Sequence, residues 1–170
     1  TLNNGQPSYQ FYRDDTAERQ VDLPLLQNHF PANGSAFHLT SLAIISGTDA
    51  DVWADFFAQQ HAAGIVTTLD PNVRPMLISD CEQYLQRLWR LMNTADILKL
   101  SDEDLEWIFP DLDFDAACAE LLTKTKAKLT IVTKGAEGAI GYCNGASVTV
   151  PAHAVPKLVD TVGAGDTFMG

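Results

Sequence analysis

Residues 65–70 read Ile-Val-Thr-Thr-Leu-Asp, a short apolar run rich in β-branched side chains. Such a run is typical of a buried strand. Helical periodicity precedes it over Thr48–Ala63, and Gly64 stands where a C-terminal cap belongs. A second helical pattern follows over Ser79–Asn93, with Ser79 and Glu82 placed as a capping box. Residues 65–70 are therefore predicted to be a strand between two helices.

The same alternation extends in both directions along the chain. A turn at Asn144-Gly145, between two strand-like runs, indicates a β-hairpin. Helix–strand alternation favours a parallel sheet with helices on both faces. We therefore expect one domain over residues 1–170 with a three-layer α/β/α, Rossmann-like, mainly parallel sheet. The remaining predicted strands are Ser8–Arg13, one contained within Ala36–Ile45, Ala95–Leu100, Lys128–Thr133, Ala139–Cys143 and Ala146–Val150, and further helices begin at Ser101 and cover Phe114–Lys126.

Composition excludes several classes of protein. The net charge of −11 repels polyanions, so binding of nucleic acid or of an anionic membrane is not expected. No apolar run is long enough to span a bilayer. Cys81, Cys118 and Cys143 are widely spaced and form no C-x-x-C pair, which indicates buried, reduced thiols in a cytoplasmic protein rather than zinc ligands or disulfides.

The end of the chain carries the most chemical information. Gly163-Ala164-Gly165-Asp166 combines three small residues with a carboxylate. If a helix begins there, its unpaired N–H groups form an anion site of the kind that phosphoryl transfer needs. A glycine-rich turn capped by Asp166 explains the same residues without function. Phe168 occupies the position of the third glycine of a dinucleotide fingerprint, which disfavours that class.

Several segments together resemble the ribokinase-like (PfkB) carbohydrate kinases, and the pattern is most similar to fructokinases and 2-keto-3-deoxygluconate kinases. The resemblance covers nearly the whole chain and implies the ribokinase-like fold. The family's chain is much longer, so we expect a partial kinase domain lacking the N-terminal strands and lid and the adenine-pocket region. The segments are Asp160–Phe168, Asp70–Pro75 (D-P-N-V-R-P), Lys99–Asp104 (K-L-S-D-E-D), Thr133-Lys134-Gly135 with Gly138, and Phe11–Arg13 with Thr16–Arg19.

The resemblance assigns the catalytic and nucleotide-binding positions. It implies that Asp166 is the base and that the backbone N–H groups of Gly163, Ala164, Gly165 and Asp166 form the anion hole. It implies ATP and Mg²⁺ as cofactors, and in some members a monovalent cation such as K⁺. The implied nucleotide-side residues are Thr133, Lys134, Gly135, Gly138, Lys99 and Ser101, and the implied metal-side residues are Asp104 for Mg²⁺ through water and the carbonyls of Asp160 and Val162 for K⁺.

Two of these assignments have simpler explanations. Ser101 and Asp104 stand where the family has an N-x-x-E stretch, but Asp reaches less far than Glu, and the pair also fits the capping box of a helix. Lys99 ends a predicted strand and can reach phosphate, or it can be an ordinary exposed lysine.

The resemblance also implies a sugar-binding set of Arg13, Arg74, Phe11 and Asn72. A guanidinium offers a planar fork that fits paired oxygens on a sugar. Arg74 can instead simply hold its own loop. Phe11 lacks the hydroxyl that 2-keto-3-deoxygluconate kinases often place there, which favours a neutral sugar such as fructose.

The predicted function is therefore an ATP-dependent sugar kinase, with fructokinase first and 2-keto-3-deoxygluconate kinase as the alternative. A non-catalytic sugar- or nucleotide-binding regulator on the same fold is the alternative from another class. The expected partners are a small sugar and ATP, and pairing as a homodimer is expected through the lid that the family carries. The 170-residue chain alone is expected to be inactive.

Overall fold

The computed structural model describes residues 2–3, 6–7, 11–155 and 163–169. The chain divides into two compact units. The larger is Gln20–Ala152, and the smaller combines Thr1–Arg19 with His153–Gly170. Among the described residues, no helix has both the length and the apolar character that crossing a bilayer requires.

The larger unit is built on one sheet, which has six strands in the described part of the chain. The spatial order β3-β4-β5-β6-β7-β8 follows the order along the chain. Strands β3 to β6 are parallel, whereas β7 and β8 are antiparallel. The strands are β3 (Ala36–Thr40), β4 (Val66–Asp70), β5 (Ile97–Ser101), β6 (Leu129–Thr133), β7 (Ala139–Cys143) and β8 (Ala146–Val150).

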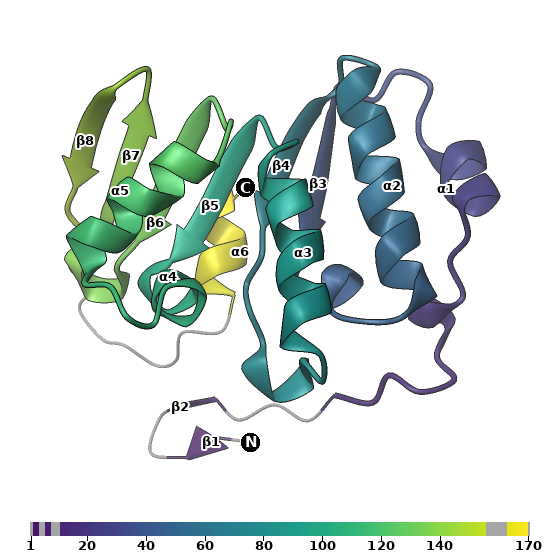
Figure 1. The fold of residues 1–170 in the computed structure, drawn as a ribbon, viewed down its shortest axis with the longest axis horizontal. Coiled ribbons are helices and arrows are strands. Elements are labelled where there is room, and N and C mark those ends of the chain that lie inside the picture. The colour runs from purple at the N-terminus through teal and green to yellow at the C-terminus, as the bar shows by residue number, and fades with distance from the viewer. Residues whose placement is uncertain (1, 4–5, 8–10, 156–162, 170) are drawn as a thin grey trace. The chain divides into compact units, whose positions relative to one another are not determined.

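Helices connect the parallel strands. Figure 1 shows α2, α3 and α5 in front of the sheet, over the same face. Because each strand lies beside the one before it, successive right-handed crossovers all fall on one side of the sheet. We predicted helices on both faces, and within this unit the long helices cover one. The helices of the unit are α1 (Leu23–His29), α2 (Thr48–Ala62), α3 (Cys81–Met92), α4 (Asp102–Ile108) and α5 (Phe114–Lys124), with short 3-10 turns η2 (Ser41–Ile44), η3 (Pro75–Leu77) and η4 (Gly135–Glu137).

The core lies between this helical layer and the sheet. Leu69, Leu98 and Leu100 are fully buried on the central strands. Burial of such side chains is worth roughly 2 kcal/mol each, so this layer supplies much of the stability of the unit. The helices contribute the buried residues Phe56, Phe57, Tyr84, Leu88, Leu91, Met92, Leu105 and Leu121.

The predicted start of one helix was wrong. Helix α3 begins at Cys81 rather than Ser79, and its cap is Asp80, whose carboxylate accepts the Gln83 N–H at 2.9 Å. An Asp cap also interacts favourably with the helix dipole. The strand predicted within 36–45 is β3, which ends at Thr40 because Ser41 takes a φ of 40° and opens a 3-10 turn.

The hairpin prediction is confirmed. Strands β7 and β8 pair around Asn144 and Gly145, whose φ angles are 50° and 77°. These are the positive values that a tight hairpin turn requires.

The smaller unit contains short elements. They are β1 (Leu2–Asn3) paired with β2 (Gln6–Pro7), η1 (Ala17–Arg19) and α6 (Ala164–Met169). The strand predicted over 8–13 is not formed at residues 11–13, and residues 8–10 lie outside the described part of the chain.

Candidate active site

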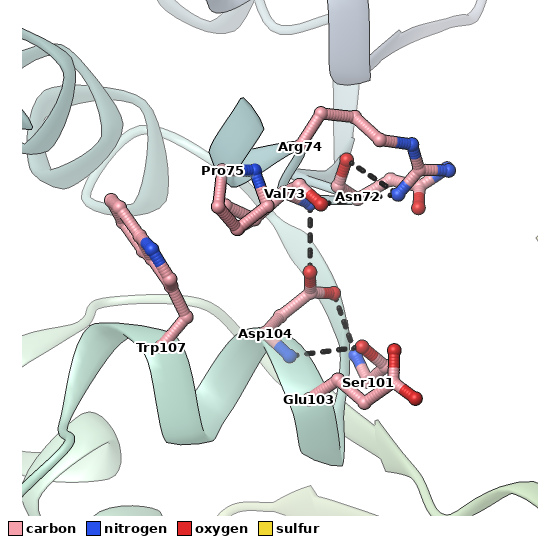
Figure 2. Close-up of a pocket in the computed structure, with 8 residues that line it drawn as sticks. All are labelled: Asn72, Val73, Arg74, Pro75, Ser101, Glu103, Asp104 and Trp107. Carbon is pink, nitrogen blue, oxygen red and sulfur yellow. Dashed lines mark hydrogen bonds between the residues drawn. The ribbon is translucent and has the colours of Figure 1, made fainter. Parts of the chain in front are cut away.

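A pocket of about 130 Å³ lies where β4 and β5 end. Its walls are the loop after β4 and the first two turns of α4, as Figure 2 shows. The carboxyl edge of a parallel sheet is where ligands bind in folds of this type. The lining residues are Asn72, Val73, Arg74, Pro75, Ser101, Glu103, Asp104 and Trp107.

The loop after β4 is held in an unusual conformation. Asn72 has a φ of 41°, a left-handed value that Asn tolerates better than most residues. The Asn72 carbonyl oxygen accepts hydrogen bonds from the Ser41 hydroxyl and from Arg74 Nη1, each at 3.2 Å. Arg74 Nη1 also donates to the Val73 carbonyl at 3.1 Å. In Figure 2 the guanidinium folds back over Asn72, so Arg74 does hold its own loop.

Ser101 and Asp104 form a capping box at the start of α4. The Ser101 hydroxyl accepts the Asp104 N–H at 3.0 Å, and Asp104 Oδ2 accepts the Ser101 N–H at 2.9 Å. The second oxygen, Asp104 Oδ1, accepts the Val73 N–H at 2.7 Å. Asp104 is buried, so its carboxylate joins the two walls of the pocket from within.

Lys99 is not an exposed lysine, so that alternative is wrong. Its ammonium is 2.9 Å from Asp70 Oδ2, and the two side chains are 6% and 2% exposed. Burial raises the pKa of Asp70, although the hydrogen bond and the charge of Lys99 oppose the change. Asp70 Oδ1 is buried without a hydrogen-bond partner among the described residues. The charge predicted to meet phosphate is therefore engaged by an internal carboxylate.

The turn after β6 contains two glycines in backbone conformations with positive φ. Gly135 and Gly138 have φ angles of 51° and 105°. The Lys134 N–H donates to the Gly138 carbonyl at 2.8 Å and closes the turn. The Lys134 ammonium lies 2.7 Å from Glu137 and 4.7 Å from the centre of the Phe114 ring. The turn is thus a compact loop at the same edge of the sheet as the pocket, since Thr133 pairs with Ser101.

In the smaller unit, a helix begins within the Gly163–Asp166 segment. Gly163 has a φ of 74° and precedes helix α6. The Thr167 N–H donates to the Gly163 carbonyl at 2.9 Å, which is the first bond of the helical ladder. The N–H groups of Ala164, Gly165 and Asp166 precede that bond and have no partner within the helix. Asp166 is exposed.

Of the other predicted site residues in the smaller unit, the structure describes Phe11 and Arg13. Arg13 Nε lies 2.7 Å from Glu18 Oε1, and Phe11 is half-buried. Asp160 and Val162 lie outside the described residues. The structure thus gathers Asn72, Arg74, Ser101 and Asp104 around one pocket, and it places Phe11, Arg13 and Asp166 in the other unit.

Three contributors were missed by sequence reasoning. Trp107 and Glu103 line the pocket, and Ser41 holds the Asn72 carbonyl from a segment 31 residues away. The Trp107 ring also packs edge-on against Tyr84, with 5.6 Å between the ring centroids. Its position three residues after Asp104 places both on one helix face, which was the available signal. The contact between Ser41 and Asn72 has no sequence signal.

A metal site built from side chains is not evident. The described residues contain no group of three or more His, Cys, Asp or Glu side chains that could hold an ion.

The three cysteines differ in burial. Cys118 is buried, but Cys81 and Cys143 are exposed, contrary to the expectation of buried thiols.

Comparison with known proteins gives a consistent result. The family model described as pfkB family carbohydrate kinase matches residues 1–170. A fructokinase from Rhizobium leguminosarum bv. trifolii is 42% identical over 98% of this chain and 50% of its own length. A probable fructokinase from Arabidopsis thaliana is 32% identical over 98% of this chain and 51% of its own length. The chain therefore spans about half the length of the curated relatives it matches.

Solved structures agree with these relatives. A fructokinase from Xylella fastidiosa with bound ATP is 30% identical, with a TM-score of 0.80 over 98% of this chain and 52% of that protein. A double mutant of a fructokinase from Vibrio cholerae, in a form with fructose, ADP and potassium bound, is 26% identical. Its TM-score is 0.72 over 80% of this chain and 43% of that protein. The ribokinase-like α/β fold is thereby confirmed.

Proposed function

The chain belongs to the pfkB family of carbohydrate kinases, and from that membership we propose that it contributes the phosphoryl-transfer part of an ATP-dependent fructokinase. The observation that carries the proposal is the pocket at the carboxyl ends of β4 and β5. It brings together Asn72, Arg74 and Ser101 from segments distant in sequence, at the edge of the sheet where small ligands bind.

In the proposed reaction, a sugar hydroxyl attacks the γ-phosphorus of ATP. The new oxygen–phosphorus bond forms as the bond to the β-phosphate oxygen breaks, and ADP leaves. Asp166 accepts the proton of the attacking hydroxyl. The N–H groups of Ala164, Gly165 and Asp166, which precede the first bond of helix α6, stabilise the charge on the transferred group.

We assign the nucleotide side to the strand ends β5 and β6. The Thr133–Gly138 turn presents backbone close to the pocket edge, because Thr133 pairs with Ser101. Lys99 stays paired with Asp70 inside the fold, so in this proposal it supports the strand ends and does not contact phosphate. Mg²⁺ would arrive with ATP and neutralise its phosphates, and Asp160 and Val162 are the proposed carbonyl ligands of K⁺. Potassium is present in the related Vibrio cholerae structure.

The acceptor is assigned to fructose because the relatives named above are fructokinases. The Arg74 bonds to the carbonyls of Asn72 and Val73 use Nη1 alone, so they do not decide between a neutral sugar and a sugar acid.

A coupled ADP-release assay of the whole protein tests this proposal. Fructose, ribose, 2-keto-3-deoxygluconate and adenosine are compared at matched concentrations with ATP and Mg²⁺. The proposal predicts the highest kcat/KM with fructose. Preference for 2-keto-3-deoxygluconate would reassign the acceptor, and ligand binding without ADP release would point to a regulator.

A further inference from the structure

Asp104 has two separate hydrogen-bonding tasks. A helix cap requires one carboxylate oxygen, and Oδ2 fulfils that requirement by accepting the Ser101 N–H at 2.9 Å. Oδ1 instead accepts the Val73 N–H at 2.7 Å, from a loop 31 residues earlier in the chain. Figure 2 shows the carboxylate standing between that loop and the start of α4. The second bond is therefore additional to capping.

The loop that Asp104 holds is restrained at the Asn72 carbonyl and at the Val73 N–H by different partners. Asn72 is in the left-handed region at a φ of 41°, which turns the next N–H out of the strand direction. The carbonyl of Asn72 is fixed by Ser41 and Arg74. Within the described part of the chain, the N–H of Val73 is fixed by Asp104. Release of this N–H would allow the loop to relax.

We propose that Asp104 is a positioning residue, which locks the sugar-side loop of Asn72 and Arg74 to the start of helix α4 rather than holding Mg²⁺. This proposal rests on the kinase function proposed above. Both carboxylate oxygens already accept main-chain N–H groups, and Asp104 is 5% exposed. The link keeps the two walls of the pocket at a fixed separation.

Two substitutions and a matched control separate the link from ordinary capping. Asp104→Ala removes both bonds. Asp104→Asn keeps the size and shape of the side chain. An amide accepts hydrogen bonds through its oxygen only, so one of the two N–H groups loses its acceptor. Asp113→Ala removes another capping carboxylate, the N-cap of α5, which accepts the Ala116 N–H at 2.8 Å and holds no second segment among the described residues.

Hydrogen exchange of the whole protein reports on the link directly. We expect the Val73 amide to exchange at least about tenfold faster in Asp104→Asn and Asp104→Ala, and at the wild-type rate in Asp113→Ala. Unchanged exchange at Val73 in both Asp104 variants would overturn the proposal. This readout does not depend on turnover, so it remains decisive if no sugar is phosphorylated and the proposed function fails.

Kinetics then distinguish positioning from metal binding. We expect Asp104→Asn to raise the KM for sugar about tenfold, while the Mg²⁺ concentration for half-maximal rate stays within about twofold of wild type. A clear rise in the Mg²⁺ requirement with an unchanged sugar KM would overturn the positioning role. Asp113→Ala is expected to leave both constants unchanged.

Discussion

Lys99 forms a buried ion pair with Asp70, so its charge is neutralised inside the fold. A lysine in a kinase-like motif is a reasonable candidate to bind phosphate. Nothing in the sequence around Lys99 indicates a partner of opposite charge. The partner comes from the neighbouring strand, 29 residues away. Strand adjacency therefore decides the role of Lys99, and adjacency is a property of the topology rather than of the local sequence.

Breaking that pair is expected to be costly. Asp70→Asn should lower the free energy of unfolding by roughly 3–5 kcal/mol, because it leaves the Lys99 ammonium buried without a counter-charge. The double variant Asp70→Asn with Lys99→Met should be less destabilised than Asp70→Asn alone. Urea denaturation of wild type, Asp70→Asn, Lys99→Met and the double variant gives the four unfolding free energies of a double-mutant cycle. Additive losses would show that the pair is not coupled.

Asp96 predicts a pH dependence of stability. Burial opposes its ionisation, but hydrogen bonds from Lys128 and from the N–H and hydroxyl of Thr67 outweigh burial and lower the pKa of Asp96 to about 2. The folded pKa lies below the unfolded value of 3.8, so the stabilisation is complete above about pH 4 and is lost as the pH falls towards 2. Its size is roughly 2 kcal/mol.

This dependence is measured by comparing wild type with Asp96→Asn. The difference in unfolding free energy should be largest near pH 6 and fall to about half by pH 3. Asp55→Asn, which breaks an exposed ion pair with Arg90, is the control and should cost under about 1 kcal/mol. A difference between wild type and Asp96→Asn that does not change with pH would contradict the assignment.

Elements with their own local signals were predicted well from sequence. Helix α2 and the hairpin of β7 and β8 were found at the expected residues, because apolar periodicity and the turn at Asn144 specify them locally. Element ends were less predictable. Asp80 and Ser79 are both good caps, and only the fold determines which one meets the N–H of Gln83.

The turn between β6 and β7 depends on one glycine more than on its neighbours. A Cβ on Gly138 would collide with the Val150 carbonyl oxygen and approach the Ala152 nitrogen to 2.8 Å. Gly138→Ala should therefore lower the free energy of unfolding by more than about 2 kcal/mol. Gly145→Ala, which has a positive φ but open space around it, should cost about 1 kcal/mol. Thermal denaturation ranks the two variants, and equal shifts would argue against the collision.

At the scale of the whole molecule, the sheet positions the site. Because the parallel strands run side by side in chain order, the residues after β4, β5 and β6 meet at one edge without any sequence proximity. Motif reasoning assigned Asn72 and Arg74 to the sugar, Ser101 to the nucleotide and Asp104 to Mg²⁺, and one pocket gathers these four residues. The capping box of Ser101 and Asp104 could be anticipated from their spacing, but the bond from the Val73 N–H to Asp104 could not, because it depends on the path of the loop after β4.

The charge of the molecule sets a further requirement. A net charge of −11 disfavours ATP in general, so binding depends on local groups such as helix N-termini and loops of backbone N–H. The Gly163–Asp166 segment is such a group, because its N–H donors precede the first bond of helix α6. The proposed kinase therefore requires this segment to act on phosphate and Asp166 to act on the sugar hydroxyl.

The rate of phosphoryl transfer from ATP to fructose in the Asp166→Asn variant of the whole protein tests this requirement most directly, with Asp111→Asn as an exposed-carboxylate control. We predict that kcat falls at least about 10³-fold while the Kd for ATP stays within about threefold of wild type, because only proton transfer is lost. A kcat within tenfold of wild type would contradict the account.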